Sequence, residues 1–116
     1  MGEYLQKFYL INIWSSWCEP CKDESGRLLE LKNDTSIMMI GINYKDKKKN
    51  ALNFLKLYGD PFEQIFVDKQ GLISINFGAY GVPETFLINH DNKVLKKYIG
   101  PLNDEDVYEI KKITKN

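Results

Sequence analysis

The chain has 116 residues, of which 43% are apolar, and its 16 Lys and Arg residues balance its 16 Asp and Glu residues. This length favours a single domain over residues 1–116 with its own hydrophobic core, and the zero formal charge excludes a nucleic-acid binder with an unbalanced basic face. The longest apolar runs are far shorter than the about 18 residues of a membrane-spanning helix, and the segment Met1–Tyr4 does not resemble the start of an export signal.

The first half of the chain predicts alternating strands and helices. Continuous apolar runs of strand length indicate strands buried on both faces, and apolar residues at helical spacing indicate the helices that follow them. The predicted elements are a strand at Phe8–Ile13, a helix from Cys18 to about Asn33, a strand at Ile37–Asn43, and a helix between an N-cap at Asp46 and a stop at Gly59. This alternation is typical of parallel strands joined by crossover helices.

The second half predicts a short strand, a hairpin and a terminal helix. The elements are a strand at Ile65–Val67, a short helix within Leu72–Tyr80, antiparallel strands at Thr85–Ile88 and Val94–Tyr98, and a helix with Asn103 as its N-cap. We assign Phe77 and Tyr80 to the core and place His90 in a solvated turn. The basic run Lys45–Lys49 is interpreted as a solvated helix start rather than a binding patch.

The two cysteines, Cys18 and Cys21, are the chain's most informative residues. Together with the single histidine, His90, they cannot supply the four ligands of a structural zinc site, and two cysteines make no disulfide framework. The pair lies where a strand turns into a helix, so free backbone N–H groups and the positive end of the helix dipole favour a thiolate at Cys18. We therefore predict a redox pair with Cys18 as nucleophile and Cys21 as the more buried resolving thiol.

The two residues between the cysteines bear on this chemistry. Pro20 fits the first helical turn because its missing N–H would have no intrahelical partner there. Glu19 places a negative charge beside Cys18 that opposes the thiolate, so we expect a moderate depression of the Cys18 pKa. The alternative is that Glu19 is an ordinary first-turn acid.

Two segments carry a resemblance to a known superfamily. Trp14–Cys21, with the sequence Trp-Ser-Ser-Trp-Cys-Glu-Pro-Cys, resembles the active-site segment of the thioredoxin superfamily. Tyr80–Ile88 resembles its second landmark, a loop with a cis proline that faces the dithiol. The resemblance therefore implies a cis bond between Val82 and Pro83, which only a proline permits at modest cost.

The resemblance can be narrowed to one branch of that superfamily. Gly81–Ile88 and Gly41–Asp46 look like the membrane-tethered cytochrome c biogenesis thioredoxins of the DsbE or CcmG type, and the likeness runs from Phe8 to about Ile113. It implies a thioredoxin-like α/β fold, in which a central mixed sheet of about five strands carries helices on both faces and ends in a C-terminal antiparallel hairpin plus helix.

The resemblance also implies a function. A protein of this type is a thiol-disulfide oxidoreductase that reduces the haem-attachment cysteines of apocytochrome c, or a cytochrome c maturation protein that handles them. A membrane thiol reductase supplies the electrons. No cofactor is implied besides the Cys18–Cys21 pair and no metal, and we expect a periplasmic monomer tethered to the inner membrane by an N-terminal anchor outside this sequence.

One departure from the superfamily concerns proton transfer. Asn12 occupies the position, six residues before Cys18, where many thioredoxins carry a buried aspartate that assists the resolving thiol. Because an amide does not titrate, we predict that Glu84, next to Pro83, tunes or deprotonates Cys21 instead. The alternative is that Glu84 is a surface acid after a turn.

Substrate binding is expected by strand addition, in which an extended peptide pairs with the backbone of Val82 before Pro83. Trp17 would form a flat apolar wall beside that peptide, or serve only in packing. Asn43–Asp46 follow the second predicted strand and are a candidate specificity edge.

Three alternative functions stay open from the sequence. The first is a general extracytoplasmic reductase similar to TlpA or ResA proteins. The second is a copper-transfer protein that uses both thiolates, although copper carriers of this fold generally space their cysteines by three and add a histidine. The third is a redox-silent interaction module.

Overall fold

The computed structural model describes residues 7–115. The segment Met1–Tyr4, which did not resemble the start of an export signal, lies outside the described residues. In chain order the elements are β1 (Tyr9–Trp14), α2 (Glu19–Asp34), β2 (Met38–Tyr44), α3 (Lys48–Tyr58), β3 (Gln64–Asp68), α4 (Leu72–Asn76), β4 (Glu84–Ile88), β5 (Val94–Ile99) and α5 (Asp104–Thr114). Each strand and helix expected from the sequence is present. Among these residues no helix is both long and apolar enough to cross a bilayer.

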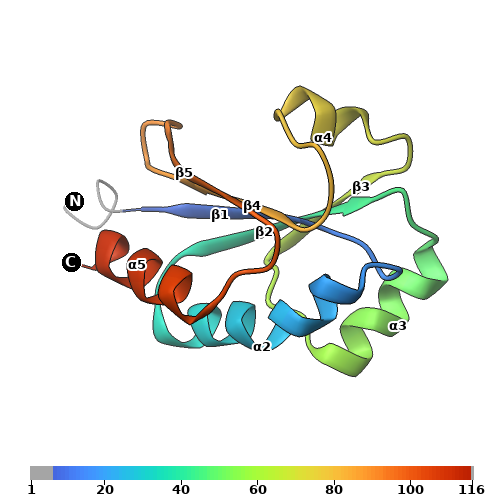
Figure 1. Ribbon diagram of the computed structural model, residues 1–116, viewed down its shortest axis with the longest axis horizontal. Coiled ribbons are helices and arrows are strands. Elements are labelled where there is room, and N and C mark those ends of the chain that lie inside the picture. Colours follow the sequence, from blue (N-terminus) through green and yellow to red (C-terminus); the bar gives the residue numbers. More distant parts are fainter. Residues whose placement is uncertain (1–6, 116) are drawn as a thin grey trace.

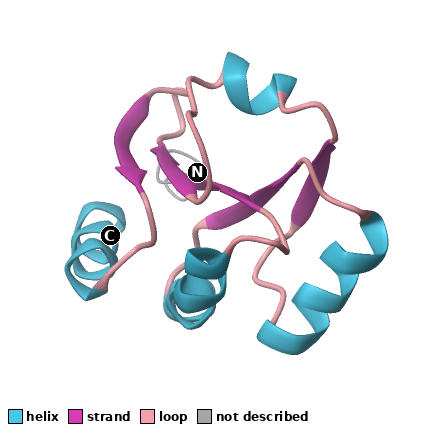
Figure 2. Ribbon diagram, turned by 45° about the vertical axis from the view of Figure 1, so that its right-hand side comes forward, coloured by secondary structure: helices cyan, strands magenta, loops and turns pink. Residues whose placement is uncertain are grey.

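The strands form one mixed sheet in the order β3-β2-β1-β4-β5. β1 pairs in parallel with β2, and β2 in parallel with β3, whereas β4 runs antiparallel to both β1 and β5. Helices α2, α3 and α5 cover one face of this sheet and α4 covers the other (Figures 1 and 2). The predicted thioredoxin-like architecture is confirmed.

The central strand explains why its sequence is apolar throughout. Successive side chains of a strand point to opposite faces, and β1 has a helix layer on each side. Leu10 therefore packs with Leu28 and Leu31 of α2, while Ile11 and Ile13 pack with Phe86 toward α4. Leu10, Ile13 and Leu31 are fully buried, and burial of one such side chain is worth about 1.5–3 kcal/mol.

Two helix starts differ in how they are capped. The predicted cap of α5 is confirmed, because the Asn103 side chain accepts from the backbone N–H of Asp106 and the Asp106 carboxylate accepts from that of Asn103. The predicted cap of α3 at Asp46 is wrong. The N-cap is Lys47, which makes no side-chain capping bond, and the Asp46 carboxylate bonds instead to the loop that precedes α2.

The segment after α4 contains one wrong core assignment. Phe77 packs against Phe86 with ring centroids 5.2 Å apart, as expected for a core residue. Tyr80 is 90% exposed, because it lies in the loop that leads to β4, with the Lys97 ammonium 4.8 Å from its ring centroid. Its aromatic character alone did not distinguish this surface position from a core position.

Two glycines make a matched pair for testing the packing under the sheet. A Cβ at Gly41 in β2 would lie 2.9 Å from Trp14 Nε1 and 2.9 Å from an atom of the Phe62 ring, whereas a Cβ at Gly26 in α2 would meet nothing within 4 Å. We expect Gly41→Ala to lower the free energy of unfolding by about 1–3 kcal/mol through overpacking. Gly26→Ala is expected to raise it by about 0.5–1 kcal/mol through helix propensity. Urea unfolding of both variants checks the pair, and equal effects would contradict this account of the packing.

Candidate active site

The cysteine pair lies at the start of α2. Cys18 is the N-cap, its backbone is extended, and its Sγ accepts a hydrogen bond from the backbone N–H of Cys21 at 3.2 Å. The two residues form a disulfide with Cα atoms 5.3 Å apart, and Pro20 occupies the first turn as predicted. Both cysteines are almost fully buried, at 4% and 2% exposure, so the expected difference in burial between them is small.

The buried surroundings of the pair come from several elements. Trp14 from β1 and the apolar face of α3, including Ala51 and Phe54, form one cluster with the two sulfurs. Val82 packs against the same cluster. This contact brings the proline loop and the dithiol together in the fold although they are far apart in sequence. The bond from Val82 to Pro83 is cis, as the resemblance implied.

The prediction that Glu84 acts on Cys21 must be corrected. Thr85 hydrogen-bonds to Asn12 on the α2 side of the sheet, so its neighbour Glu84 points to the opposite face. The buried Glu84 carboxylate accepts from the backbone N–H groups of Tyr80 and Gly81 at 2.7 and 2.9 Å, and Lys97 Nζ lies 3.4 Å from it. Glu84 therefore holds the loop that leads to Pro83.

The buried acid on the dithiol side of the sheet is Glu24. It lies one turn after Cys21 on the same buried face of α2 and is 1% exposed. Its carboxylate accepts from Asn12 Nδ2 at 2.9 Å and from the backbone N–H of Leu102 at 2.8 Å. Burial raises the pKa of Glu24 to about 7, although these two hydrogen bonds act in the opposite direction.

Asn12 connects this acid to the surroundings of Cys21. Besides Glu24, its amide donates to the Thr85 hydroxyl at 3.0 Å. Asn12 also borders a small cavity of about 10 Å³ that Trp14 and Cys21 line with it. The amide that replaces the usual aspartate is thus a hydrogen-bonding partner of a titratable group rather than a titratable group itself.

Sequence reasoning missed Glu24, although its signal was present. Cys21, Glu24, Leu28 and Leu31 fall at i, i+3, i+7 and i+10 and form the buried stripe of α2. A carboxylate on an otherwise apolar stripe is rarely buried without a partner or a function. The leucines indicated the stripe, and the acid within it was overlooked.

Trp17 and Glu19, the two residues on either side of Cys18 in the sequence, are on the surface. Glu19 is exposed and forms an ion pair with Lys22 one turn later on α2. Trp17 is 57% exposed, and its indole Nε1 donates to the backbone carbonyl of Lys45 at 2.9 Å. Trp17 is therefore held in place at the rim of the site and remains accessible.

The candidate specificity edge Asn43–Asp46 contacts the active-site loop directly. The Asp46 carboxylate accepts from the backbone N–H and the hydroxyl of Ser16 at 2.6 and 2.7 Å, and from Asn43 Nδ2 at 3.1 Å. Burial alone would raise the pKa of Asp46, but these hydrogen bonds and that from the backbone of Lys47 outweigh it and hold the pKa below its usual value. Asp46 thus pins the residues that precede Cys18.

The site combines a cysteine pair at a helix start with a cis proline beside it. A comparison of the whole sequence with protein-family models agrees with this arrangement. The family model described as Redoxin matches residues 1–113. The chain belongs to the Redoxin family. Curated relatives narrow this assignment, and solved structures support the fold.

The curated relatives confirm the resemblance to DsbE-type proteins. The chain is 43% identical over 95 residues to the thiol:disulfide interchange protein CycY of Rhizobium leguminosarum bv. viciae, a match that covers 82% of this chain and 51% of the relative. It is 36% identical over 94 residues to the thiol:disulfide interchange protein DsbE of Escherichia coli K12, covering 81% and 50% respectively. This Redoxin chain therefore spans about half the length of the curated relatives it matches.

Solved structures agree on the fold. A putative thiol:disulfide interchange protein DsbE from Chlorobium tepidum superposes with a TM-score of 0.77 at 23% identity, over 96% of this Redoxin chain and 79% of that chain. A DsbF homologue from Corynebacterium diphtheriae gives a TM-score of 0.79 at 24% identity, over 97% and 74%. Similarity at this level of identity supports the fold alone.

Proposed function

We propose that this chain is a thiol-disulfide oxidoreductase that reduces disulfides of protein substrates in cytochrome c maturation. The observation that carries the proposal is the placement of Cys18 as the N-cap of α2, bonded to Cys21 and beside the loop of Val82. The implied substrate is apocytochrome c or a thiol protein that handles it. A membrane thiol reductase as electron donor and a periplasmic, membrane-tethered location are part of the same proposal.

The reaction proceeds from the reduced protein in two exchange steps. The Cys18 thiolate attacks one sulfur of the substrate disulfide, that bond breaks, and one substrate thiolate leaves and takes up a proton. Deprotonated Cys21 then attacks Cys18 Sγ in the mixed disulfide and releases the second substrate thiolate. The second substrate thiolate also takes up a proton. Two electrons pass to the substrate, one of its two protons balances the proton lost by Cys21 and the other comes from solvent, and the protein ends with the Cys18–Cys21 disulfide.

The first step depends on the local electrostatics of Cys18. In the structure its Sγ accepts from the backbone N–H of Cys21, and Cys18 caps the amino terminus of α2, the positive end of the helix dipole. Both features stabilise negative charge on the sulfur. Glu19 opposes them only weakly, because its carboxylate is solvated and paired with Lys22.

The second step needs a proton acceptor for Cys21, and Glu24 has the required properties. It is buried on the same face of α2, and its pKa of about 7 lets it exchange a proton near neutral pH. Asn12 links the Glu24 carboxylate to the small cavity that Cys21 borders. We assign Glu24 the role that the sequence had suggested for Glu84.

Cysteine variants test the proposed chemistry. Because Cys21→Ser removes the resolving thiol, it should accumulate a mixed disulfide through Cys18 with a disulfide peptide of the Cys-x-x-Cys-His type. Cys18→Ser should form no adduct and show no turnover. Mass spectrometry of the unreduced reaction mixture measures both outcomes.

Two measurements separate the specialised reductant from a general reductase and from a copper carrier. Fast reduction of the Cys-x-x-Cys-His peptide with slow reduction of insulin supports the specialised reductant, whereas equal rates indicate a general reductase. Stoichiometric copper binding by the reduced protein without any thiol turnover would contradict the proposal and favour a copper carrier.

A further inference from the structure

Helix α3 and the turn before it carry a concentration of positive charge. Residues 45–59 contain five lysines, and all five are exposed: Lys45, Lys47, Lys48, Lys49 and Lys56. The one acidic residue in this stretch is Asp46, whose carboxylate is occupied by Ser16, Asn43 and the backbone of Lys47. Since the whole chain has no net charge, this segment is a local basic surface.

No carboxylate of the described residues pairs with these lysines, and only Lys45 has its ammonium over an aromatic ring, 5.3 Å from the ring centroid of Tyr44. Within residues 7–115, none of the five has a carboxylate oxygen within 4 Å, whereas Lys22, Lys32 and Lys111 elsewhere are all paired. The first turn of α3 contains lysines and no acid. Lysines at the positive end of a helix dipole weaken the helix slightly, so their clustering does not serve the stability of α3.

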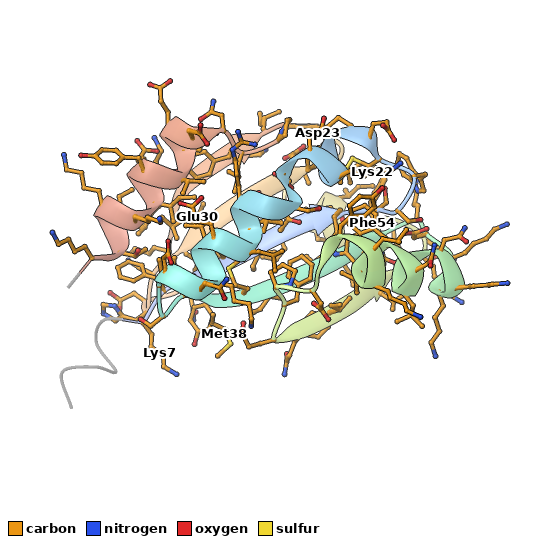
Figure 3. All side chains as sticks on the ribbon, turned by 90° about the horizontal axis from the view of Figure 1, so that it is seen from below. Lys7, Lys22, Asp23, Glu30, Met38 and Phe54 are labelled. Atoms are coloured by element: carbon orange, nitrogen blue, oxygen red, sulfur yellow. A yellow bond between two sulfur atoms is a disulfide. The ribbon has the colours of Figure 1, made fainter. Side chains whose placement is uncertain are left out.

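An open groove lies between the residues that precede Cys18 and helix α3, the helix that carries most of these lysines. The groove has a volume of about 300 Å³ and is lined by Ser16, Trp17 and Lys22 on one side and by α3 residues, including Phe54 and Leu57, on the other. Figure 3 shows Lys22 of α2 and Phe54 of α3 beside each other on this side of the molecule. Trp17 and Leu57 are 57% and 67% exposed, so the groove presents apolar side chains to a partner.

Although the sequence favoured a solvated helix start for Lys45–Lys49, we propose that the groove and the lysines at the start of α3 dock an acidic segment of the protein whose disulfide Cys18 attacks. Apolar side chains of that segment would lie between Trp17 and Leu57, and its carboxylates would face the lysines at the start of α3. This inference rests on the proposed function and specifies the substrate class as proteins with acidic residues near the reacting cysteine. A protein segment is favoured over an anionic membrane because the groove begins at Ser16 and Trp17, directly before Cys18.

The physical consequence is a rate that depends on charge and salt. Complementary charges raise association rates at low ionic strength, and the effect declines as the Debye length falls from about 30 Å at 0.01 M to about 3 Å at 1 M salt. A neutral small disulfide should not sense the lysines, because it has no charge to align. Its rate reports the chemistry of Cys18 alone.

The test compares two disulfide peptides with the same Cys-x-x-Cys-His ring, one flanked by Glu and Leu residues and the other by Gln and Leu residues. Their oxidation of the reduced protein is followed by stopped-flow tryptophan fluorescence, together with that of the neutral 2-hydroxyethyl disulfide. For the triple variant K47Q/K48Q/K49Q we expect about a tenfold lower rate with the acidic peptide in low salt. We expect less than about a twofold change with the neutral peptide and the neutral disulfide, and the difference should vanish near 1 M salt.

A matched control removes three lysines from the opposite end of the molecule. Lys93, Lys112 and Lys115 are exposed and lie near the β4–β5 turn and α5, far from α3 (Figure 1). The variant K93Q/K112Q/K115Q has the same net charge as the α3 variant and should react with the acidic peptide at the wild-type rate. Urea unfolding of both variants verifies that they remain folded.

Three outcomes would overturn the docking proposal. They are equal rates for acidic and neutral peptides with the wild-type protein, equal losses in the two lysine variants, and loss of binding to phosphatidylglycerol vesicles by the α3 variant with unchanged peptide rates. The last would assign the surface to a membrane. If the wild-type protein reduces none of the disulfides, including 2-hydroxyethyl disulfide, the proposed oxidoreductase function itself fails.

Discussion

The difference in the free energy of unfolding between Glu24→Gln and wild type should shift in favour of the variant by about 3 kcal/mol as the pH rises from about 4 to about 8. The pKa of Glu24 is about 7 in the folded protein, against a reference value of 4.5. Between these values the folded state holds a proton that the unfolded state has lost, so wild-type stability falls as the pH rises. The glutamine side chain of the variant carries no titrating proton, and this contribution to the pH dependence disappears.

The measurement is urea unfolding of the oxidised protein at several pH values. Glu84→Gln is the matched control: the same chemical change on the opposite face of the sheet, where the carboxylate meets Tyr80, Gly81 and Lys97. A stability difference between Glu24→Gln and wild type that stays constant with pH would refute the assignment of a raised pKa to Glu24.

The same variant tests the proposed proton transfer. General acid–base catalysis typically contributes about 100-fold or more, so Glu24→Gln should slow the resolution of the mixed disulfide by about that factor near neutral pH. The pH profile for alkylation of Cys21 in the reduced protein should also change, whereas in Glu84→Gln it should not. An unchanged Cys21 profile in Glu24→Gln would remove Glu24 from the mechanism.

Replacing Asp46 by Ala should destabilise the protein by about 2–4 kcal/mol. Hydrogen bonds to a charged group contribute about 1.5–3 kcal/mol each and do not add fully. The substitution removes the acceptor of the Ser16 backbone N–H and hydroxyl and of the Asn43 amide. It should also slow the reaction of Cys18 with disulfides, because the loop that leads into α2 is no longer pinned.

The contribution of Asp46 has the opposite pH dependence to that of Glu24. Its pKa in the folded state lies below its unfolded value, so its stabilisation is present above the unfolded pKa and is lost as the pH falls through the folded pKa. Asp91→Ala is the control, since the Asp91 side chain is largely exposed and pairs only with His90 within residues 7–115, and its effect should stay within about 0.5 kcal/mol. Equal losses in the two variants, measured by urea unfolding, would show that Asp46 makes no special contribution.

Much of the fold was predictable because its signals are local. The periodicity of α2, the apolar run of β1 and the cap of α5 at Asn103 each depend on residues within a few positions of one another. The failure at Asp46 has a tertiary cause. Its carboxylate accepts two hydrogen bonds from Ser16, which lies 30 residues earlier in the chain, and nothing near Asp46 in sequence indicates this.

The sequence by itself determined which two residues form the cysteine pair and which class of protein the chain resembles. The spacing of Cys18 and Cys21 at a strand-to-helix junction, followed later by Val82–Pro83, carries that information in short segments. Only the tertiary structure decided which acid lies on the same side of the sheet as the dithiol. A strand's side chains alternate between faces, and the pairing of Thr85 with Asn12 turns Glu84 away from the helix that carries Cys21. The register between β1 and β4, and the packing of α2 against them, set that choice and leave Glu24 as the buried acid on the side of Cys21.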